Sequence, residues 1–368
     1  MPAKPPFRAD HVGSLLRQPE LIAAHTAHLE GRLPAQDLRA LETVAIADAI
    51  AMQERVGLDA ITDGELCRNN WRDRFFERVD GFSSHKVESS FIFTDYSGEH
   101  RRGMPVPVVV GKLKRRASLT ADDFAFLKSR TTRTAKATIP APSANHFFSG
   151  DASLKGSPYR DRKAFFADVT AIYRDEIADL AQLGCRYLQI DEVPIAVLCD
   201  PKNQARVRER GEDPESLIDD YIDAINDMVR DRPPSMTVCV HLCRGNAGHG
   251  QASGGYDPVA ERLFQRTNVD GFFLEYDTER AGDFAPLRHL PKNKIAVLGI
   301  ISTKLRELEP IDAVKRRIEE AARYVDLDRL CLSPQCGFAS GYNVDRLTVA
   351  DQERKLAHVV KIANEVWN

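Results

Sequence analysis

The strongest constraint on the fold is an alternation along the chain: short runs rich in β-branched and aromatic residues are followed by longer segments with apolar residues every three or four positions. Eight runs are predicted strands, namely Phe7–Val12, Leu58–Thr62, Ala137–Ile139, Arg186–Ile190, Thr237–His241, Gly271–Leu274, Lys294–Ile300 and Arg329–Leu332. Six intervening segments have the spacing of amphipathic helices, namely Leu41–Val56, Ala121–Arg130, Arg162–Leu183, Ser216–Arg230, Tyr256–Gln265 and Ala313–Tyr324. This alternation indicates an α/β fold with a parallel sheet.

Eight strands with following helices predict a (β/α)8 barrel, the TIM barrel, in which about 250 residues are typical and insertions are common. The chain has 368 residues and no Gly/Ser linker, so we expect a single catalytic domain over residues 1–368. A doubly wound sheet is the alternative architecture. Two stretches fall outside the repeat: an N-terminal helical arm at Gln18–Leu38, and Gly81–Gly111, expected as a β-hairpin-like flap inserted after the second strand.

The composition is that of a soluble globular protein that acts on a small molecule. Apolar residues make up 43% and charged residues 29%, and the formal charge is −3, so neither nucleic acid nor an anionic membrane is an expected partner. The sequence has no run of 18 apolar residues and no secretory signal, so we expect a cytoplasmic protein. Seven cysteines are expected as free thiols or metal ligands rather than disulfides: Cys67, Cys185, Cys199, Cys239, Cys243, Cys331 and Cys336.

Polar residues follow most of the predicted strands. Functional groups of TIM barrels gather at the carboxyl ends of the strands, so these residues are expected to face one another. The segments are H-V-G-S at 11–14, D-G-E at 63–65, D-E at 191–192, H-L-C-R-G-N at 241–246, E-Y-D at 275–277 and S-P-Q-C-G at 333–337.

The spacing of His241 and Cys243 suggests a metal site. Two residues apart on a strand, their side chains point to the same face. Glu275 and Cys336 from other strand ends complete a nitrogen, an oxygen and two sulfur donors, a plausible tetrahedral Zn²⁺ set, whereas H-x-C by itself is also compatible with an incidental thiol. Zinc held by two thiolates suits deprotonation of a third thiol, and Glu275 is the ligand that exchanges most readily.

Glu65 and Asp191 come at the ends of two predicted strands. Two carboxylates that face a site can hold the ammonium group of a ligand. The alternative is a local role, in which Glu65 belongs to a turn that caps the next helix and Asp191 is an N-cap before Pro194. We favour the site role because of the position of both residues in the barrel.

Taken together, these motifs resemble the catalytic domain of cobalamin-independent methionine synthase and its short single-domain relatives. The resemblance runs nearly end to end, with the motifs in order. It is carried by R-A-D-H-V-G-S-L-L-R (8–17), I-T-D-G-E (61–65), L-Q-I-D-E (188–192), H-L-C-R-G-N (241–246), F-L-E-Y-D (273–277), L-G-I-I-S-T-K (298–304) and S-P-Q-C-G-F (333–338).

The resemblance implies a TIM barrel in which zinc binds the sulfur of homocysteine and a methyl group moves onto it from methyltetrahydrofolate. It implies that the zinc ligands are His241, Cys243, Glu275 and Cys336. It also implies that Glu65 and Asp191 hold the ammonium group of homocysteine, that the backbone of Ser14 meets its carboxylate, and that Phe148 stacks on the pterin.

Two departures from the long family enzyme bear on the methyl donor. That enzyme has a second, N-terminal barrel that helps to bind polyglutamylated folate, and 368 residues leave no room for it. Lys304 stands where the long enzyme has the histidine thought to protonate the departing folate nitrogen, so Lys304 is a candidate catalytic residue. The donor therefore stays open among methylfolate, a methylated corrinoid protein and other donors.

The predicted function is a zinc-dependent transfer of a methyl group to homocysteine, which gives methionine. A close alternative is alkyl transfer or epoxide opening with coenzyme M as the thiol, whose sulfonate Arg8, Arg68 and Arg244 would bind. Two further alternatives are a metal-free decarboxylase on a porphyrin-processing barrel and a zinc protein without catalysis. The sequence leaves open whether the chain forms a homo-oligomer.

Overall fold

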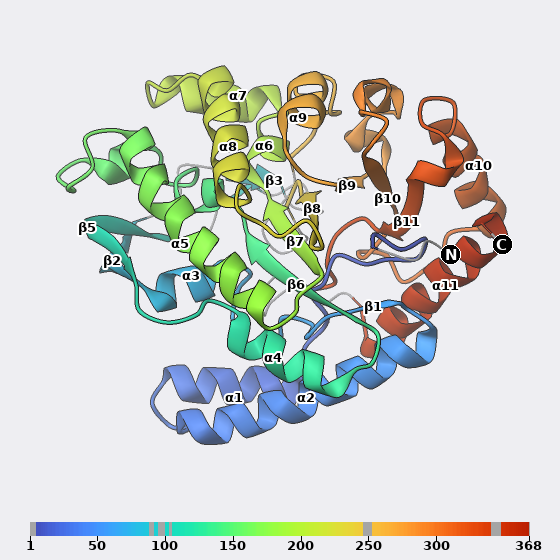
Figure 1. Cartoon of the computed structure of the whole chain (residues 1–368), viewed down its shortest axis with the longest axis horizontal. Helices are drawn as coiled ribbons and strands as arrows, with labels where there is room; N and C mark the ends of the chain where they lie inside the picture. Colours follow the sequence, from blue (N-terminus) through green and yellow to red (C-terminus); the bar gives the residue numbers. More distant parts are fainter. Residues whose placement is uncertain are drawn as a thin grey trace.

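Seven parallel strands form one curled sheet in the order β1-β6-β7-β8-β9-β10-β11, which follows the chain (Figure 1). The computed structural model describes residues 5–87, 92–94, 100–102, 105–245, 252–339 and 347–367. The strands of the sheet are β1 (Ala60–Ile61), β6 (Thr134–Pro140), β7 (Tyr187–Glu192), β8 (Thr237–Leu242), β9 (Gly271–Glu275), β10 (Ile295–Ile301) and β11 (Leu330–Pro334). The predicted α/β class and seven of the eight predicted strand positions are confirmed.

The predicted first strand, Phe7–Val12, is not a regular strand. It makes one parallel bridge, between Ala9 and Leu332 of β11, with backbone hydrogen bonds of 3.0 and 2.8 Å around it. The carboxylate of Asp10 accepts hydrogen bonds from the N–H groups of Phe7 and His11. These N–H groups are therefore not available for hydrogen bonds to a neighbouring strand. On its other side, Thr62 just after β1 donates to the carbonyl of Gly13, so the segment lies between β11 and β1 as in a TIM-like barrel.

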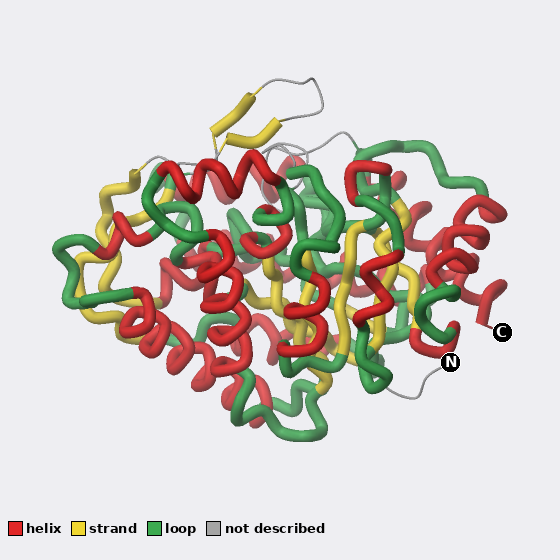
Figure 2. Tube along the Cα trace, turned by 90° about the horizontal axis from the view of Figure 1, so that it is seen from above, coloured by secondary structure: helices red, strands yellow, loops and turns green. Residues whose placement is uncertain are grey.

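The helices surround the sheet, and Figure 2 shows them on the outside of the strands. They are α1 (Pro19–Leu29), α2 (Ala35–Val56), α3 (Asp73–Arg78), α4 (Ala121–Arg130), α5 (Arg162–Gln182), α6 (Pro194–Val197), α7 (Pro201–Glu209), α8 (Pro214–Met228), α9 (Ala260–Arg266), α10 (Ile311–Ala321) and α11 (Val349–Trp367). The predicted arm Gln18–Leu38 comprises α1 and the start of α2, which begins before the predicted Leu41. None of the helices in the described residues is long and apolar enough to cross a membrane.

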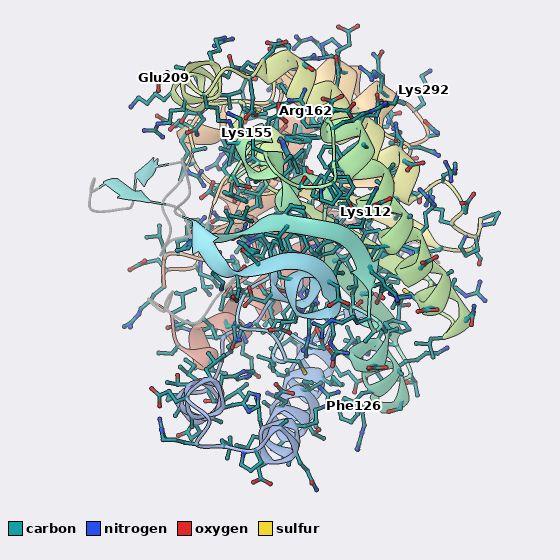
Figure 3. All side chains as sticks on the ribbon, turned by 90° about the vertical axis from the view of Figure 1, so that its left-hand side faces the viewer. Lys112, Phe126, Lys155, Arg162, Glu209 and Lys292 are labelled. Carbon is teal, nitrogen blue, oxygen red and sulfur yellow. The ribbon has the colours of Figure 1, made fainter. Side chains whose placement is uncertain are left out.

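The predicted flap at Gly81–Gly111 lies within two antiparallel pairs: β2 (Val79–Val87) with β5 (Val106–Arg115), and β3 (Ile92–Thr94) with β4 (His100–Arg102). Residues 88–91, 95–99 and 103–104 of that prediction lie outside the described residues. The Lys112 ammonium on β5 contacts Asp168 of α5 at 3.1 Å, and Figure 3 shows the β2–β5 ribbon with this side chain. The ribbon is thus attached to the barrel, and its role as a flap stays a prediction.

At the end where the strands begin, the interior of the barrel is largely apolar, apart from the buried ion pair of Lys136 and Asp10 at 3.1 Å. A buried cluster fills the end where the strands begin: Phe7, Val12, Ala60, Tyr187, Cys239, Phe273, Val297 and Cys331. Because side chains alternate along a strand, Asp191 of β7 and His241 of β8 point to the same interior, and they are register partners. The polar interior layer therefore lies at the carboxyl ends of the strands, where function is expected.

Candidate active site

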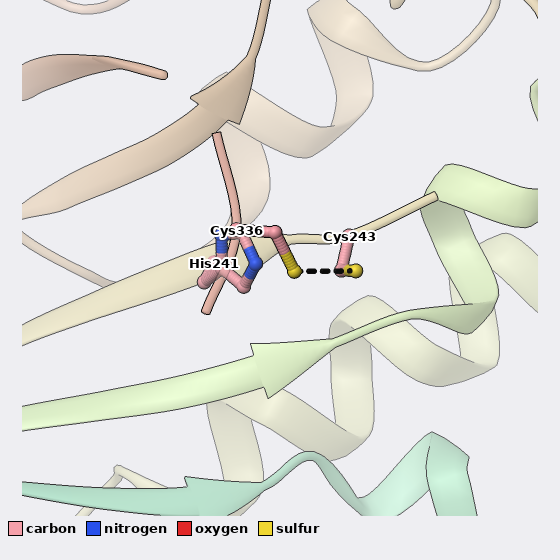
Figure 4. A group of neighbouring side chains, drawn as sticks. All are labelled: His241, Cys243 and Cys336. Carbon is pink, nitrogen blue, oxygen red and sulfur yellow. Dashed lines mark hydrogen bonds between the residues drawn. The ribbon is translucent and has the colours of Figure 1, made fainter. Parts of the chain in front are cut away.

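The ligand atoms of His241, Cys243 and Cys336 all lie within 4.8 Å of one another (Figure 4). His241 lies on β8, Cys243 directly follows that strand, and Cys336 follows β11. The two Sγ atoms are 3.2 Å apart, and all three side chains are buried. The structure therefore brings together three of the four predicted zinc ligands.

The charges of this group are coupled. The hydrogen bond with Cys243 and the nearby imidazole hold the pKa of Cys336 well below its ordinary value, whereas the same hydrogen bond, together with burial, raises the pKa of Cys243. Burial lowers the pKa of His241, but its acidic neighbours outweigh burial and raise it. Neither ring nitrogen of His241 has a hydrogen-bond partner in the part of the chain that the structure describes. Buried nitrogen and sulfur donors that converge in this way fit a thiophilic ion such as zinc.

Glu275, the predicted fourth ligand, is not part of this close group. Its Oε2 accepts a hydrogen bond of 3.0 Å from the backbone N–H of Arg244 and lies 3.8 Å from Arg280. Its Oε1 is buried and has no partner among the described residues. Burial raises the pKa of Glu275 to about 7, and the charge of Cys336 adds to this. One carboxylate oxygen is thus held in place beside the three ligands, and coordination by the other stays a prediction.

Glu65 is the one non-glycine residue with positive φ, at 59°, in the described residues. It follows Gly64, which has φ 69°, and the carboxylate of Asp63 accepts the N–H of Glu65 at 2.9 Å. Its Oε1 accepts a hydrogen bond of 3.0 Å from Thr138 of β6. Left-handed backbone at a bulky residue costs free energy and is concentrated at functional sites, which favours the predicted site role over a simple turn.

Asp191 lies close enough to Glu65 for their charges to interact. Burial raises the pKa of Asp191 to about 7, and the charge of Glu65 adds to the shift. Gln189, on the same interior face of β7, donates to Asp191 at 2.7 Å, which fixes the orientation of the carboxylate. The buried guanidinium of Arg68 donates to Thr138 at 2.9 Å and offsets part of this negative charge. Two neighbouring buried carboxylates suit an ammonium group, and this role for Glu65 and Asp191 stays a prediction.

Ser14 lies against the loop that carries Cys336. The N–H of Phe338 donates to the carbonyl of Ser14 at 2.9 Å. A Cβ atom added at Gly337 would lie 1.8 Å from Ser14 Oγ, 3.1 Å from Ser14 Cβ and 3.4 Å from the carbonyl oxygen of Ser14, so a side chain there would displace Ser14 or the loop. The first segment of the chain is thus held next to the metal-ligand loop.

Lys304 follows β10 and is buried, with 4% of its surface exposed. Its ammonium group has no hydrogen-bond partner among the described residues. Burial lowers its pKa to about 8, and the charge of Cys336 opposes this shift. Lys304 therefore faces the protein interior near Cys336 rather than solvent.

Phe148 lies in the loop after β6, and Arg72 covers one face of its ring. The guanidinium carbon of Arg72 is 4.5 Å from the ring centroid, and Phe147 packs edge-on at 5.4 Å. A pterin would thus meet only the other face in this conformation. Sequence reasoning missed Arg72 because a lone arginine after a turn carries no motif. It also missed Thr138 and Gln189, although both lie on the interior face of their strands.

A second group of possible ligand atoms comprises His146, Asp151 and Glu212. These side chains already have partners: His146 contacts Asp151 and Tyr221 at 3.0 Å each, and Arg210 contacts Glu212 at 2.8 Å. Two arginines, Arg210 and Arg162, lie against the carboxylates, so a cation is not needed there.

Comparison with known proteins places the chain in one family. Residues 7–365 match the family described as "Cobalamin-independent synthase, Catalytic domain". The chain is 42% identical to the uncharacterized protein YxjH of Bacillus subtilis over 99% of this chain and 96% of that protein. It is 24% identical to a methionine synthase of Pyrococcus furiosus over 89% of this chain and 84% of that one.

Solved structures show the same relationship. A candidate vitamin-B12-independent methionine synthase from Listeria monocytogenes superposes with a TM-score of 0.77 at 36% identity, over 99% of this chain and 98% of that one. The fold is also that of a B12-independent methionine synthase from Shewanella sp. W3-18-1 in complex with selenomethionine, at a TM-score of 0.73 and 21% identity, over 98% and 97% of the two chains. The chain therefore belongs to the cobalamin-independent methionine synthase catalytic-domain family.

Proposed function

We propose that this protein is a zinc-dependent methyltransferase that moves a methyl group onto the thiol of homocysteine and forms methionine. The observation that carries the proposal is the buried group of His241, Cys243 and Cys336, with both imidazole nitrogens unpartnered among the described residues. Glu65 and Asp191 supply an adjacent position for the ammonium group of an amino acid. A cytoplasmic location is part of the proposal.

A bound zinc ion would lower the pKa of the substrate thiol and keep it nucleophilic at neutral pH. His241, Cys243 and Cys336 would hold the ion, and Glu275 would supply the exchangeable fourth ligand. Glu65 and Asp191 would fix the ammonium group so that the sulfur meets the methyl carbon in line.

In the transfer, a sulfur–carbon bond forms while the bond between the methyl carbon and its donor breaks. The departing group of the donor then needs a proton or another positive centre to accept the electron pair. The ammonium group of Lys304 is buried near Cys336 and has a pKa of about 8, which suits a proton donor at neutral pH. We propose this role for Lys304, with methyltetrahydrofolate, a corrinoid or another compound as the donor.

The alternative with coenzyme M is disfavoured by the placement of the arginines. Arg8 donates hydrogen bonds to the backbone carbonyls of Asp328 and Leu330. Arg244 donates a hydrogen bond to the backbone carbonyl of Gly254. Arg68 has two unpartnered nitrogens among the described residues, but two carboxylates accompany it. A sulfonate would be repelled by those carboxylates, whereas an amino acid uses them. Titration of the zinc protein with both thiols distinguishes them, and heat from coenzyme M alone would refute the homocysteine proposal.

The proposal is tested by a methyl-transfer assay on zinc-loaded protein with homocysteine and three donors in parallel: methyltetrahydrofolate, methylcobalamin and S-methylmethionine. We expect methionine from at least one donor and none from metal-stripped protein. Cys336→Ser should lose zinc and at least about 100-fold in activity. Cys185→Ser changes a buried free cysteine outside the site and should leave both unchanged. Equal activity of the stripped protein or of Cys336→Ser would contradict the proposal.

A further inference from the structure

Arg72 is a buried cation that the described part of the fold does not pair. It directly precedes α3, only 5% of its surface is exposed, and its Nη1 has no hydrogen-bond partner among the described residues. The other buried arginines differ: Arg17 and Arg244 donate to backbone carbonyls, and Arg68 donates to Thr138. Arg72 makes no such hydrogen bond and no ion pair within the described residues, which calls for an explanation.

Aromatic rings surround the guanidinium of Arg72. Its carbon lies 4.5 Å from the ring centroid of Phe148, 5.7 Å from that of Trp71 and 5.9 Å from that of Phe76. Burial lowers the pKa of Arg72 to about 10, and only the charge of Asp73 opposes this. Cation–π contacts offset part of the desolvation cost, but an apolar side chain of similar volume would fill the same space with no such cost. Packing alone therefore does not account for an arginine.

Arg72 and Phe148 occupy a different part of the site from the acidic pair. They lie in the loops that follow β1 and β6, at the carboxyl ends of the strands. The charges of Glu65 and Asp191 act on Arg68 but not on Arg72. A ligand that reaches Phe148 thus meets a positive charge there, whereas the thiol substrate meets negative charges near the metal ligands.

From this geometry we infer that Arg72 is a specificity-determining residue that binds an anionic oxygen group, a carboxylate or a phosphate, on the methyl donor. The inference rests on the proposed methyl transfer for the identity of that ligand. A guanidinium presents its N–H donors in a planar fork that matches such oxygens, and its carbon lies 4.5 Å from the ring centroid of Phe148. Two sources share this chemistry: the glutamate tail of a folate and the phosphodiester of a complete corrinoid.

Calorimetric titration of zinc-loaded protein in the absence of thiol tests the inference with two pairs of compounds. One pair is 5-methyltetrahydrofolate and its α,γ-diamide, in which both glutamate carboxylates are neutral. The other is methylcobalamin and methylcobinamide, which lacks the nucleotide that carries the phosphodiester. We expect the anionic member of one pair to bind at least about tenfold more tightly, which identifies the source. Arg72→Met should reduce that ratio to within about twofold of unity.

Arg78→Met is the matched control, because Arg78 ends the same helix, is partly exposed and lies 3.9 Å from Asp122. It should keep the wild-type ratio. Arg72→Met should leave homocysteine affinity unchanged and should not lower the urea midpoint of unfolding. A lower midpoint is the result expected if Arg72 had only a structural role. If Arg72→Met does not fold, Arg72→Gln serves the same test.

Two results overturn the inference. In the first, the anionic member of neither pair binds more tightly, which includes the case in which no compound binds. In the second, the ratio of the two affinities is the same in the Arg72 variant as in the wild type. Failure of homocysteine to bind is a separate result. It would refute the proposed function while leaving the assignment of an anion to Arg72 intact.

Discussion

At the scale of single residues, the site divides into three chemical parts. Sulfur and imidazole donors gather at Cys336 and His241, carboxylates gather at Asp191, and a buried guanidinium stands over Phe148. We propose that each part binds a different group: a thiol, an ammonium group and an anion.

Glu65→Gln removes one charge from the acidic pair while keeping the hydrogen bond to Thr138 sterically possible. We expect kcat/KM for homocysteine to fall by roughly 10- to 100-fold, because a charge-assisted hydrogen bond to the ammonium group contributes about 1.5–3 kcal/mol. Zinc content should not change. Steady-state kinetics with 4-mercaptobutyrate, which lacks the amino group, supplies the control: its rate should be nearly the same in both proteins. An equal decrease in kcat/KM with both thiols would show that Glu65 does not bind the ammonium group.

Glu192 faces away from the barrel interior, and its raised pKa predicts that the stability of the protein depends on pH. Burial raises its pKa from 4.5 to about 7, although Ser143 and the N–H of Ile195 donate to it. Because the folded state holds the proton more tightly than the unfolded state, this group contributes up to roughly 3 kcal/mol below pH 4.5, and that contribution is lost as the pH rises through about 7. Urea unfolding at pH 5 and pH 8 should show Glu192→Gln with a smaller decrease in stability than wild type. The same decrease in both proteins would exclude Glu192 as its source.

Individual site residues could be predicted to different extents. The spacing of His241 and Cys243 indicated a shared face, and the structure brings both to Cys336. The lack of an ion pair at Arg72 within the described residues could not be predicted, because it depends on how far the carboxylates lie from Arg72 in the folded protein. The burial of Lys304 could not be predicted from the sequence either, because most lysines are exposed.

At the scale of elements, the loop after β11 connects the metal ligands to the start of the chain. Gly337 approaches Ser14 so closely that an added methyl group would displace the Ser14 hydroxyl. The element that carries Cys336 is therefore positioned by a backbone contact rather than by its own hydrogen bonds alone.

Gly337→Ala should displace the loop that carries Cys336. The added Cβ would lie 1.8 Å from Ser14 Oγ, and overpacking of this kind costs about 1–3 kcal/mol. We expect weaker zinc binding and at least about tenfold lower activity, measured by metal titration and the methyl-transfer assay. Gly111→Ala is the control, because its nearest neighbour would be 3.6 Å away. Normal zinc affinity in Gly337→Ala would mean that the contact does not position Cys336.

Strand and helix positions were largely predictable because each element carries its own periodicity. The predicted helix Ala121–Arg130 matches α4, and Thr237–His241 matches β8 to within one residue. The segment at Phe7–Val12 was wrong as a regular strand because Asp10 binds neighbouring backbone N–H groups. The helix at Val349–Trp367 was missed although Leu356, Val359 and Ile362 repeat at helical spacing.

At the scale of the whole molecule, the parallel sheet brings together residues that are far apart in sequence. Strand order follows chain order, so the ends of β1, β7, β8 and β11 come around one polar interior layer. The α/β class followed from the alternation of elements, whereas mutual distances among the site residues required the curled sheet itself. The family assignment agrees with both.

The central claim is that His241, Cys243 and Cys336 hold a zinc ion that accepts a substrate thiol. Zinc-edge X-ray absorption of the purified protein, before and after homocysteine is added, tests it most directly. The account predicts about one zinc per chain with nitrogen and two sulfur ligands, and one further sulfur ligand when homocysteine is present. No bound zinc, or a sulfur count that homocysteine leaves unchanged, would contradict it.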